Sequence, residues 1–562
     1  MKFSEMPYTR PDLDALAQAS AQAVAALDGA ETAQAQLEAC RVYQETADQV
    51  ATQCNIAYIR HTIDTRDAFY EAEQDFIDEA MPKIQELDQK VTHALLRSPF
   101  RKELSEALGS LLFTNLEIEA RSFDPKILPL MQEENKLTSA YQKLYASAMV
   151  EFDGKTMPLP KLGPYKESQD RAVRRAAYEA EGKFFDEHQQ ELDELFDKLV
   201  KNRTEQAKLM GHENYLQLGY DRLGRNCYDP KKVEAFREQI AKDMVPIVAR
   251  VKEDQRKRLG LDHLRFYDDV MLFADGNAKP AGSSDEILKA GREMYHGLSP
   301  ETAEFVDFLY DNELLDVLSK DGKAPGGYCT DIPGYKAPFI FSNFNGTSGD
   351  VDVLTHEAGH AFAAYRAFKN GLPAKLRSPT MESCECHSMS MEFLTQDYHE
   401  KFFGAATRKY EVGHCEDSLI FIPYGCMVDE FQTRVYENPD WTPAQRNAFW
   451  LTLEQKYRPW IDFDNLPFYG RGAGWQRQLH IYLYPLYYID YCMAQTVAFQ
   501  FWLASLENRE DAWKRYLAFV DKGGTATFEE LVSGAGLKLP YAPGAIREIG
   551  EKILAWIDAN PL

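Results

Sequence analysis

The chain has 562 residues, of which 88 are acidic and 63 are basic, so its formal net charge is −25. Charged residues make up 27% and hydrophobic residues 44%, a composition that excludes a disordered or fibrous chain. The acidic balance argues against a general nucleic-acid-binding protein and against attraction to an anionic membrane surface, because both need clustered Lys and Arg.

The N-terminal residues and the cysteines favour a soluble, cytoplasmic protein. Residues 1–12 contain acids and prolines where a signal peptide needs an apolar core. The longest uncharged apolar run, residues 418–428, is too short to span a bilayer. Nine cysteines without framework spacing fit reduced thiols in a cytosol.

Residues 11–150 are predicted to be helical, because their apolar residues recur at helical spacing and Ala, Gln, Glu and Leu are frequent. Residues 152–166 interrupt this pattern with glycines and prolines, which predicts a hairpin or a linker. Helix resumes at Arg171. We therefore expect a helical N-terminal lobe over residues 1–165 and a catalytic lobe over residues 166–562.

Helix start signals recur further along the chain. Ser299 and Thr442 each precede a proline at the first helical position. Thr527 and Glu530 have the spacing of a capping box, in which a hydroxyl and a carboxylate each satisfy a backbone donor. These signals extend the helical prediction over much of the second half of the chain.

The main β signal lies between Gly326 and Thr347. Pro338 at the start of the run Phe339–Phe344 suits an edge strand, because proline donates no ladder hydrogen bond. The sequence thus predicts a mainly α protein with a small edge-strand β element.

One short motif beside this strand carries the chemistry. His356 to His360 read His-Glu-Ala-Gly-His, which on a helix places two imidazoles on one face. Neutral imidazoles in this arrangement suit Zn²⁺, which lowers the pKa of a bound water to about 7. Glu357 lies beside that face, where it can accept a proton from this water and later deliver it to the leaving amine. Gly359 costs the helix about 1 kcal/mol relative to Ala, which indicates close packing.

A catalytic zinc ion needs a third protein ligand. Residues 380–394 are predicted to form a second helix, and Pro373 and Pro379 separate it from the first, so that it can return across the site. Glu382 and Glu385 are the candidate ligands on this helix, and spacing alone does not choose between them. Three further side chains compete with them: Cys384, Cys386 and His387.

A third feature is a segment rich in tyrosine. Residues 482–491 contain five tyrosines. His480, Tyr484, Tyr488 and Tyr491 share one face if the segment is a single helix, and their donors then stabilise the oxyanion of a tetrahedral intermediate. The glycine-rich stretch over residues 470–474 is interpreted as a flexible flap or an ordinary loop.

Together these motifs resemble the M3 family of zinc metallopeptidases, the group of oligoendopeptidase F and thimet oligopeptidase. The resemblance covers most of the chain and includes residues 152–155, 167–171, 343–347 and 428–432 besides the segments above. It implies a zincin-like catalytic lobe and a helical N-terminal lobe that enclose a deep channel, which admits short peptides.

The resemblance also implies the site residues. The third ligand of one Zn²⁺ ion is Glu385, and a further glutamate of the family pattern falls at Glu392. His480 and the three tyrosines of its face correspond to substrate-facing residues of the family. The implied activity is hydrolysis of internal bonds in short oligopeptides by a zinc-bound water, with Glu357 as the base. Peptides are the expected partners, and the oligomeric state is open.

The peptide backbone is expected to pair with the strand Phe339–Phe344 by β-augmentation. Five residues of this region are candidates for the substrate groove: Gly326, Gly327, Tyr328, Phe341 and Asn343.

Two other functions stay open. A zinc exopeptidase of the carboxypeptidase or aminopeptidase type would use the same ligands and a fixed charge to capture a peptide terminus. Arg471 and Arg477 are candidate anchors for a carboxylate, although ordinary surface arginines are the stronger interpretation. The alternative outside enzymes is a non-catalytic helical peptide-binding protein with a structural zinc site.

Overall fold

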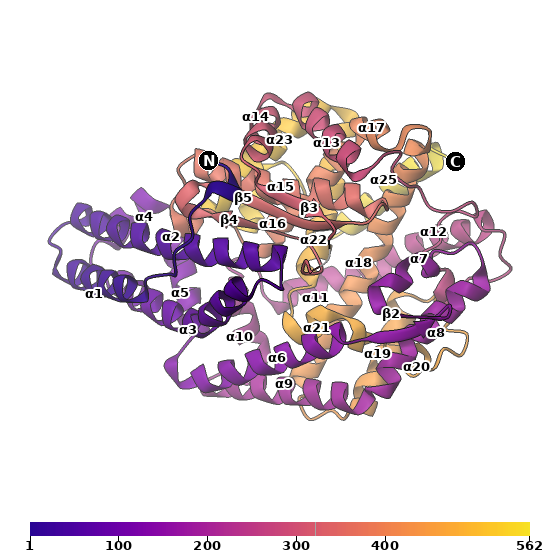
Figure 1. Ribbon diagram of the computed structural model, residues 1–562, viewed down its shortest axis with the longest axis horizontal. Helices are drawn as coiled ribbons and strands as arrows, with labels where there is room; N and C mark the ends of the chain where they lie inside the picture. The colour runs from indigo at the N-terminus through magenta and orange to yellow at the C-terminus, as the bar shows by residue number, and fades with distance from the viewer. Residues whose placement is uncertain (321, 562) are drawn as a thin grey trace. The chain divides into compact units, whose positions relative to one another are not determined.

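The computed structural model describes residues 1–320 and 322–561 (Figure 1). The described chain forms two compact units, each assembled from three stretches. Of the described residues, unit 1 contains 1–121, 279–407 and 497–538, and unit 2 contains 122–278, 408–496 and 539–561. The predicted boundary at residues 165 and 166 lies inside unit 2. The division of the sequence into an N-terminal lobe and a catalytic lobe stays a prediction.

No helix among the described residues combines the length and the apolar character needed to cross a membrane.

Unit 1 opens with helices that pack on one another (Figure 1). Asp12, Thr32 and Asp67 accept backbone N–H groups at the starts of the first three helices, so each start is fixed by a side-chain cap. Leu16, Ile77 and other apolar side chains at helical spacing form the buried core between them. The predicted helices of this region are confirmed: α1 (Leu13–Gly29), α2 (Ala33–Ile63), α3 (Ala68–Leu96), α4 (Arg101–Leu108) and α5 (Leu112–Ser122).

The rest of unit 1 surrounds a small sheet with helices. The elements are α13 (Ser284–Leu298), α14 (Pro300–Asp311), β3 (Leu315–Leu318), β4 (Tyr328–Ile332), β5 (Ala337–Phe344), α15 (Gly349–Lys369), α16 (Met381–Leu394), α17 (Glu400–Phe403), α23 (Arg509–Asp521) and α24 (Phe528–Gly534). Helix α22 (Ile489–Glu507) belongs to unit 2 up to Thr496 and to unit 1 from Val497.

The prediction that the strand after Pro338 lies at an edge is wrong. Strand β5 is the centre of the sheet, parallel to β3 and antiparallel to β4. Its residues are nearly all buried, which is typical of a strand covered on both sides. Pro338 is tolerated because it pairs only with Asp331 of β4, and the register with β3 begins at Ile340. The edge strands are therefore β3 and β4.

Unit 2 is also mainly helical. Its elements are α6 (Leu128–Ala146), β1 (Met149–Phe152), β2 (Lys155–Pro158), α7 (Gly163–Lys166), α8 (Arg171–Glu187), α9 (Gln189–Leu209), α10 (Tyr215–Arg222), α11 (Pro230–Gln239), α12 (Val245–Arg258), α18 (Thr407–Glu437), α19 (Pro443–Tyr457), α20 (Pro467–Gly470), α21 (Leu479–Leu483) and α25 (Ala545–Ala559). The hairpin predicted after Phe152 is present as the antiparallel pair of β1 and β2.

The predicted helix starts are confirmed in both units. Ser299, Thr442 and Thr527 each form a capping box at the first turn of α14, α19 and α24, respectively. With only two small sheets among the described residues, the mainly α prediction is confirmed.

Candidate metal centre

The motif helix α15 is fixed at its start by Asp350. The carboxylate of Asp350 accepts the backbone N–H groups of Asn345 at 2.8 Å and Gly346 at 2.7 Å, which ties the end of β5 to the helix. Further along the helix His356 and His360 share a face, with ring centroids 5.0 Å apart. The opposite face of the helix is buried in unit 1, so the two imidazoles have a defined direction.

Helix α16 brings Glu385 to the two histidines. The Oε2 atom of Glu385 lies 3.4 Å from Nε2 of His356 and 3.4 Å from Nε2 of His360. Ser388 donates its hydroxyl to the same oxygen at 3.0 Å. Among the described residues, one ligand atom from each of the three side chains lies within 4.8 Å of the others, a group that could hold a metal ion.

The close approach of α15 and α16 depends on Gly359. A Cβ atom at this position would lie 2.6 Å from Cα of Ser388 and 2.7 Å from the carbonyl oxygen of His387. Real side chains do not reach such distances, so only glycine permits the two ligand helices to pack here. The close packing that the sequence indicated at Gly359 is confirmed.

Glu392 makes a contact that sequence analysis did not assign. Its Oε1 atom lies 2.7 Å from Nδ1 of His356. An ionised carboxylate accepts the Nδ1 proton, which leaves Nε2 of His356 as the lone-pair donor on the side of Glu385. The signal was present in the sequence, since Glu392 lies seven residues, about two helical turns, after Glu385.

The donor set fits a divalent cation. Two imidazole nitrogens and a carboxylate oxygen are the ligands that zinc takes in catalytic sites. Glu357, Glu385 and Glu392 bring three carboxylates to the two histidines, an excess of negative charge that favours a bound cation. The residues of this cluster therefore match the metal that the resemblance implies.

Glu357 is 9% exposed and lies beside the cluster. Burial raises the pKa of Glu357 above its ordinary value, whereas His356 and His360 act to lower it. A carboxylate with a raised pKa in a desolvated site is suited to accept a proton from water.

The rival ligands do not belong to this group. Glu382 is fully buried and accepts a hydrogen bond from the Thr380 hydroxyl at the start of α16. Cys386 is fully buried. The ring of His387 packs edge-on against Phe519. None of these residues belongs to the three-residue group defined among the described part of the chain.

The residues suggested for a substrate groove surround β4. Tyr328 stacks on Phe341 with centroids 4.8 Å apart, and its hydroxyl lies 2.7 Å from that of Thr62. Phe341 is 1% exposed, so its ring supports Tyr328 and does not face solvent. The side-chain amide of Asn343 donates to the carbonyl oxygen of Gly326 at 3.0 Å and fixes the loop before β4.

The single helical face predicted from His480 to Tyr491 is wrong. Helix α21 ends at Leu483 and α22 begins at Ile489. Between them Leu486 adopts a φ of +67°, a left-handed conformation that is rare for leucine. Gln432 accepts the N–H of Leu486 at 3.0 Å, and Arg225 donates to its carbonyl oxygen at 2.7 Å, so tertiary contacts hold the turn.

The turn nevertheless gathers the predicted side chains in unit 2. The ring centroid of His480 lies 4.9 Å from that of Tyr488, 5.9 Å from that of Tyr491 and 6.0 Å from that of Tyr484. Tyr487, which sequence analysis did not select, joins the cluster at 6.2 Å from His480. These side chains belong to unit 2, and the metal ligands belong to unit 1.

The glycine-rich stretch before His480 is not a flap. A Cβ on Gly472 would lie 2.3 Å from the carbonyl oxygen of Asn447. Trp475 is fully buried and donates its indole N–H to the side chain of Asn447 at 2.8 Å. The segment is thus packed into the core of unit 2.

Two family profiles match the chain. The family described as "Peptidase M3 N-terminal domain" matches residues 3–123, and the one described as "Peptidase family M3" matches residues 164–551. Among solved structures, PZ peptidase A with inhibitor 2 is 46% identical to this chain. The match has a TM-score of 0.95 and covers 99% of each of the two chains.

Two further relatives are similar over most of their length. The structure of a putative oligoendopeptidase F from Bacillus anthracis strain Ames is 41% identical, with a TM-score of 0.90 and coverage of 100% of this chain and 98% of that chain. An oligoendopeptidase F homolog of Borreliella burgdorferi is 22% identical over 466 residues, which cover 79% of this chain and 75% of the relative.

Proposed function

Since this chain belongs to peptidase family M3 and is a metallo-oligopeptidase, we propose that it hydrolyses internal bonds of short peptides with one Zn²⁺ ion as cofactor. The observation that carries the proposal is the group of His356, His360 and Glu385, whose ligand atoms converge within 4.8 Å. These three side chains would hold the ion.

When bound, zinc lowers the pKa of water to about 7 and polarises a carbonyl group. Glu392 keeps the His356 ring in place through Nδ1. The carboxylate of Glu357 accepts the proton of the attacking water and donates it to the nitrogen of the leaving amine. The raised pKa of Glu357, caused by its burial, supports this role.

His480 and the tyrosines around it are proposed to donate hydrogen bonds to the oxyanion. Burial raises the pKa of Tyr488, so its phenol stays protonated at neutral pH and remains a donor. Tyr484 is 54% exposed, which leaves its hydroxyl available to a ligand. Tyr491 packs against Tyr488 with ring centroids 5.6 Å apart and completes the same group.

The peptide backbone is proposed to add to β4, because β5 is central and β4 has a strand on only one side among the described residues. Gly326 and Gly327 precede this strand, and Tyr328 begins it. A Cβ on Gly327 would lie 3.3 Å from the carbonyl oxygen of Phe341, closer than most real Cβ contacts, so a larger residue would require the backbone there to shift. Asn343 supports this loop through its bond to Gly326.

A cytoplasmic location is part of the same proposal, since nine scattered cysteines suit a reducing compartment. The zinc exopeptidase and the non-catalytic binding protein remain the alternatives, and no observation of the site favours either of them.

The test compares the parent protein with Glu357→Gln. We expect about one zinc ion per chain in both proteins by elemental analysis, since Glu357 is not a ligand. Hydrolysis of a quenched peptide library should fall by about 10²–10⁴-fold or more in the variant, because the base is lost. Undiminished hydrolysis in Glu357→Gln would overturn the mechanism.

A second measurement separates the alternatives. Peptides blocked at both ends should be cut at internal bonds, and mass spectrometry locates the cuts. If only peptides with a free end are cut, the protein is an exopeptidase. If zinc is bound and no peptide is cut, the non-catalytic function holds.

A further inference from the structure

Tyr58 is an exposed aromatic side chain on helix α2 of unit 1. Its side chain is 39% exposed, and its ring centroid lies 5.1 Å from that of Tyr328, the first residue of β4. Thr62 follows one turn later on α2, and its hydroxyl lies 2.7 Å from that of Tyr328. Two residues of α2 thus contact the side chain that begins the edge strand. Sequence analysis did not select Tyr58, because no local pattern shows which distant strand it meets.

Side chains along the edge strand alternate between two faces of the sheet. A Cβ on Gly327 would lie 3.7 Å from Cγ1 of Val353 on α15, so Gly327 and Cys329 belong to the face of the motif helix. Tyr328 lies between them and points to the face of α2, where it meets Tyr58. A peptide strand added to β4 has the same alternation, so every second side chain of the peptide lies on the α2 face.

The backbone of β4 determines which part of the edge is open to the peptide. Asp331 pairs with Pro338, which has no N–H to donate, and the carbonyl oxygen of Asp331 accepts from the side-chain amide of Asn55 on α2 at 2.7 Å. The backbone groups of Asp331 therefore point away from β5. Since these directions alternate along an antiparallel strand, the N–H and C=O groups of Cys329 also point to the open edge. Asn55 occupies the edge at Asp331, which leaves Cys329 and the residues before it for the peptide.

A peptide side chain next to Tyr328 extends a row of aromatic rings. Phe341 is the cross-strand partner of Tyr328 on β5, and their rings stack with centroids 4.8 Å apart. A peptide residue directly opposite Tyr328 has its Cβ about 4.5–5.5 Å from that of Tyr328, so its side chain continues this row beside Tyr58. A large apolar side chain is favoured there, because it loses apolar area to the rings and aromatic pairs add to that gain.

The one ammonium group beside this row that the structure describes does not favour an acidic side chain. Nζ of Lys323 lies 4.6 Å from the ring centroid of Phe341. The side chain of Lys323 is fully buried, and its ammonium group pairs with Asp316 at 2.5 Å. Its charge is therefore already neutralised within unit 1.

We propose that Tyr58 and Tyr328 form a subsite for a large apolar side chain of the peptide substrate. The proposal rests on the peptidase function proposed above and on the addition of the peptide to β4, and it names the class of substrate. Preferred peptides carry Phe, Leu or a similar residue at one fixed position relative to the cleaved bond. Tyr58 is the specificity-determining residue, and its exposure allows it to be replaced without disturbing the core.

Val42 provides a matched control. It is a 46% exposed apolar residue on the same helix, 16 residues and therefore about 24 Å before Tyr58. Val42→Ala removes exposed apolar surface from α2 without changing the subsite.

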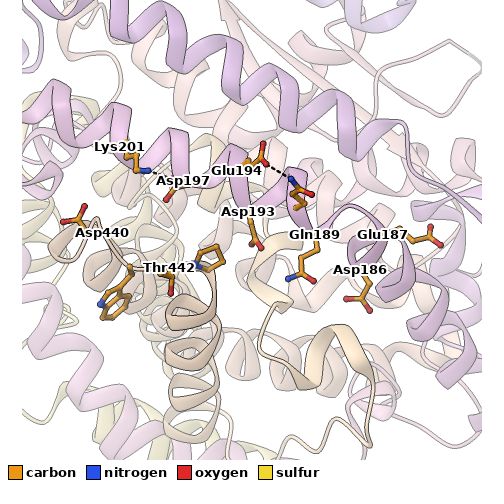
Figure 2. A pocket seen from close by; sticks show the side chains of 12 residues that line it. Asp186, Glu187, Gln189, Asp193, Glu194, Asp197, Lys201, Asp440 and Thr442 are labelled. Carbon is orange, nitrogen blue, oxygen red and sulfur yellow. Dashed lines mark hydrogen bonds and ion pairs between the residues drawn. The ribbon is translucent and has the colours of Figure 1, made fainter.

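The test peptides contain no Lys or Arg, because unit 2 has an acidic pocket (Figure 2). The carboxylates that line it are those of Asp186, Glu187, Asp193, Glu194, Asp197 and Asp440. Lys201 lies in the same pocket and pairs with Asp197 at 2.6 Å. A cationic peptide attracted to these carboxylates would bind without contacting Tyr58, and a neutral peptide avoids this.

The experiment moves a single Phe along a neutral peptide of Ala and Ser that is blocked at both ends. The values of kcat/KM for quenched versions are measured with the parent, Tyr58→Ala, Tyr58→Phe and Val42→Ala. Dissociation constants of the same peptides are measured on the zinc-loaded Glu357→Gln form of each protein, which binds without turnover.

In the parent we expect Phe at one position to improve both kcat/KM and binding on the order of ten-fold over Ala. Tyr58→Ala should lose most of this preference at that position, whereas Tyr58→Phe and Val42→Ala should keep it. A parental preference in Tyr58→Ala at every position, or an equal loss at all positions, overturns the proposal. Absent hydrolysis contradicts the peptidase function alone, because the binding ratio is measured separately.

Discussion

Glu392 influences the metal centre without belonging to the three ligands. Its carboxylate lies 2.7 Å from Nδ1 of His356 and is 12% exposed at the side chain. Such a contact fixes the tautomer of a ligand histidine and raises its basicity. The negative charge of Glu392 therefore contributes to cation binding, although Glu392 lies about two helical turns after Glu385.

We expect Glu392→Gln to weaken zinc binding by about 10–100-fold, because glutamine can still accept from Nδ1 but carries no charge. Activity at limiting zinc should fall, and added zinc should restore most of it. Competition with a chelator gives the affinity. Glu382→Gln is the matched control, since Glu382 lies on the same helix outside the cluster. The zinc affinity of the Glu382→Gln protein should equal that of the parent. Parental zinc affinity in Glu392→Gln contradicts the assignment.

Residues also differ in how readily sequence reveals them. The two histidines were predictable because a helix fixes their spacing locally. The choice between Glu382 and Glu385 was not, because both are acidic residues near one face of the same helix. The structure brings Glu385 to the histidines and places Glu382 at the helix start, bonded to Thr380.

At the scale of elements, the site depends on how closely α15 and α16 pack. Their contact passes through Gly359, which faces the backbone of His387 and Ser388. Any side chain at this point pushes the helix with the two histidines away from the helix with Glu385. Helix separation is thus coupled to the distance between ligands.

Gly359→Ala should lower the free energy of unfolding by about 1–3 kcal/mol, because overpacking against backbone outweighs the gain in helix propensity. Zinc affinity should fall as well. Urea unfolding followed by circular dichroism measures the first effect. Gly29→Ala is the control, since Gly29 ends α1 and no atom lies within 4 Å of a Cβ there, so stability should stay unchanged or rise. A Gly359→Ala protein as stable as the parent contradicts the packing argument.

Two elements did not follow their local sequence signals. Pro338 indicated an edge strand, but the strand is central. The proline is tolerated there because it precedes the part of β5 that pairs with β3. The segment from His480 to Tyr491 had helical spacing, but Gln432 and Arg225 hold a turn at Leu486. In both cases residues far away in the sequence determine the backbone.

At the scale of the whole molecule, a buried ion pair contributes to the pH dependence of stability. Glu134 of α6 accepts from Arg203 of α9 at 2.6 Å, and Arg203 is fully buried. Burial alone would raise the pKa of Glu134, but Arg203 and Arg222 lower it to about 2. An unfolded glutamate has a pKa of about 4.3, so folding lowers the pKa of this group.

Glu134 therefore stabilises the fold above pH ~4.3, and this contribution disappears as the pH falls towards 2. Its size is on the order of 3 kcal/mol. Glu134→Gln should lose about 3–5 kcal/mol of stability at pH 7, because Arg203 keeps a buried charge without its partner. Its unfolding free energy should also depend less on pH between about 4 and 2.

Urea unfolding at a series of pH values checks this expectation. Glu133→Gln is the control, because Glu133 is the exposed neighbour on the same helix and its removal should leave both stability and pH dependence unchanged. A Glu134→Gln protein with the stability of the parent at pH 7 would show that the ion pair contributes nothing to the fold.

The sequence by itself determined the helical class, the capped helix starts and the motif helix with its two histidines and Glu357. These features follow from interactions between residues a few positions apart, which spacing reveals directly. Only the tertiary structure decided the central position of β5, the contact of Glu392 with His356 and the turn at Leu486. Each of these depends on residues distant in the chain, whose approach is determined by packing and not by local pattern.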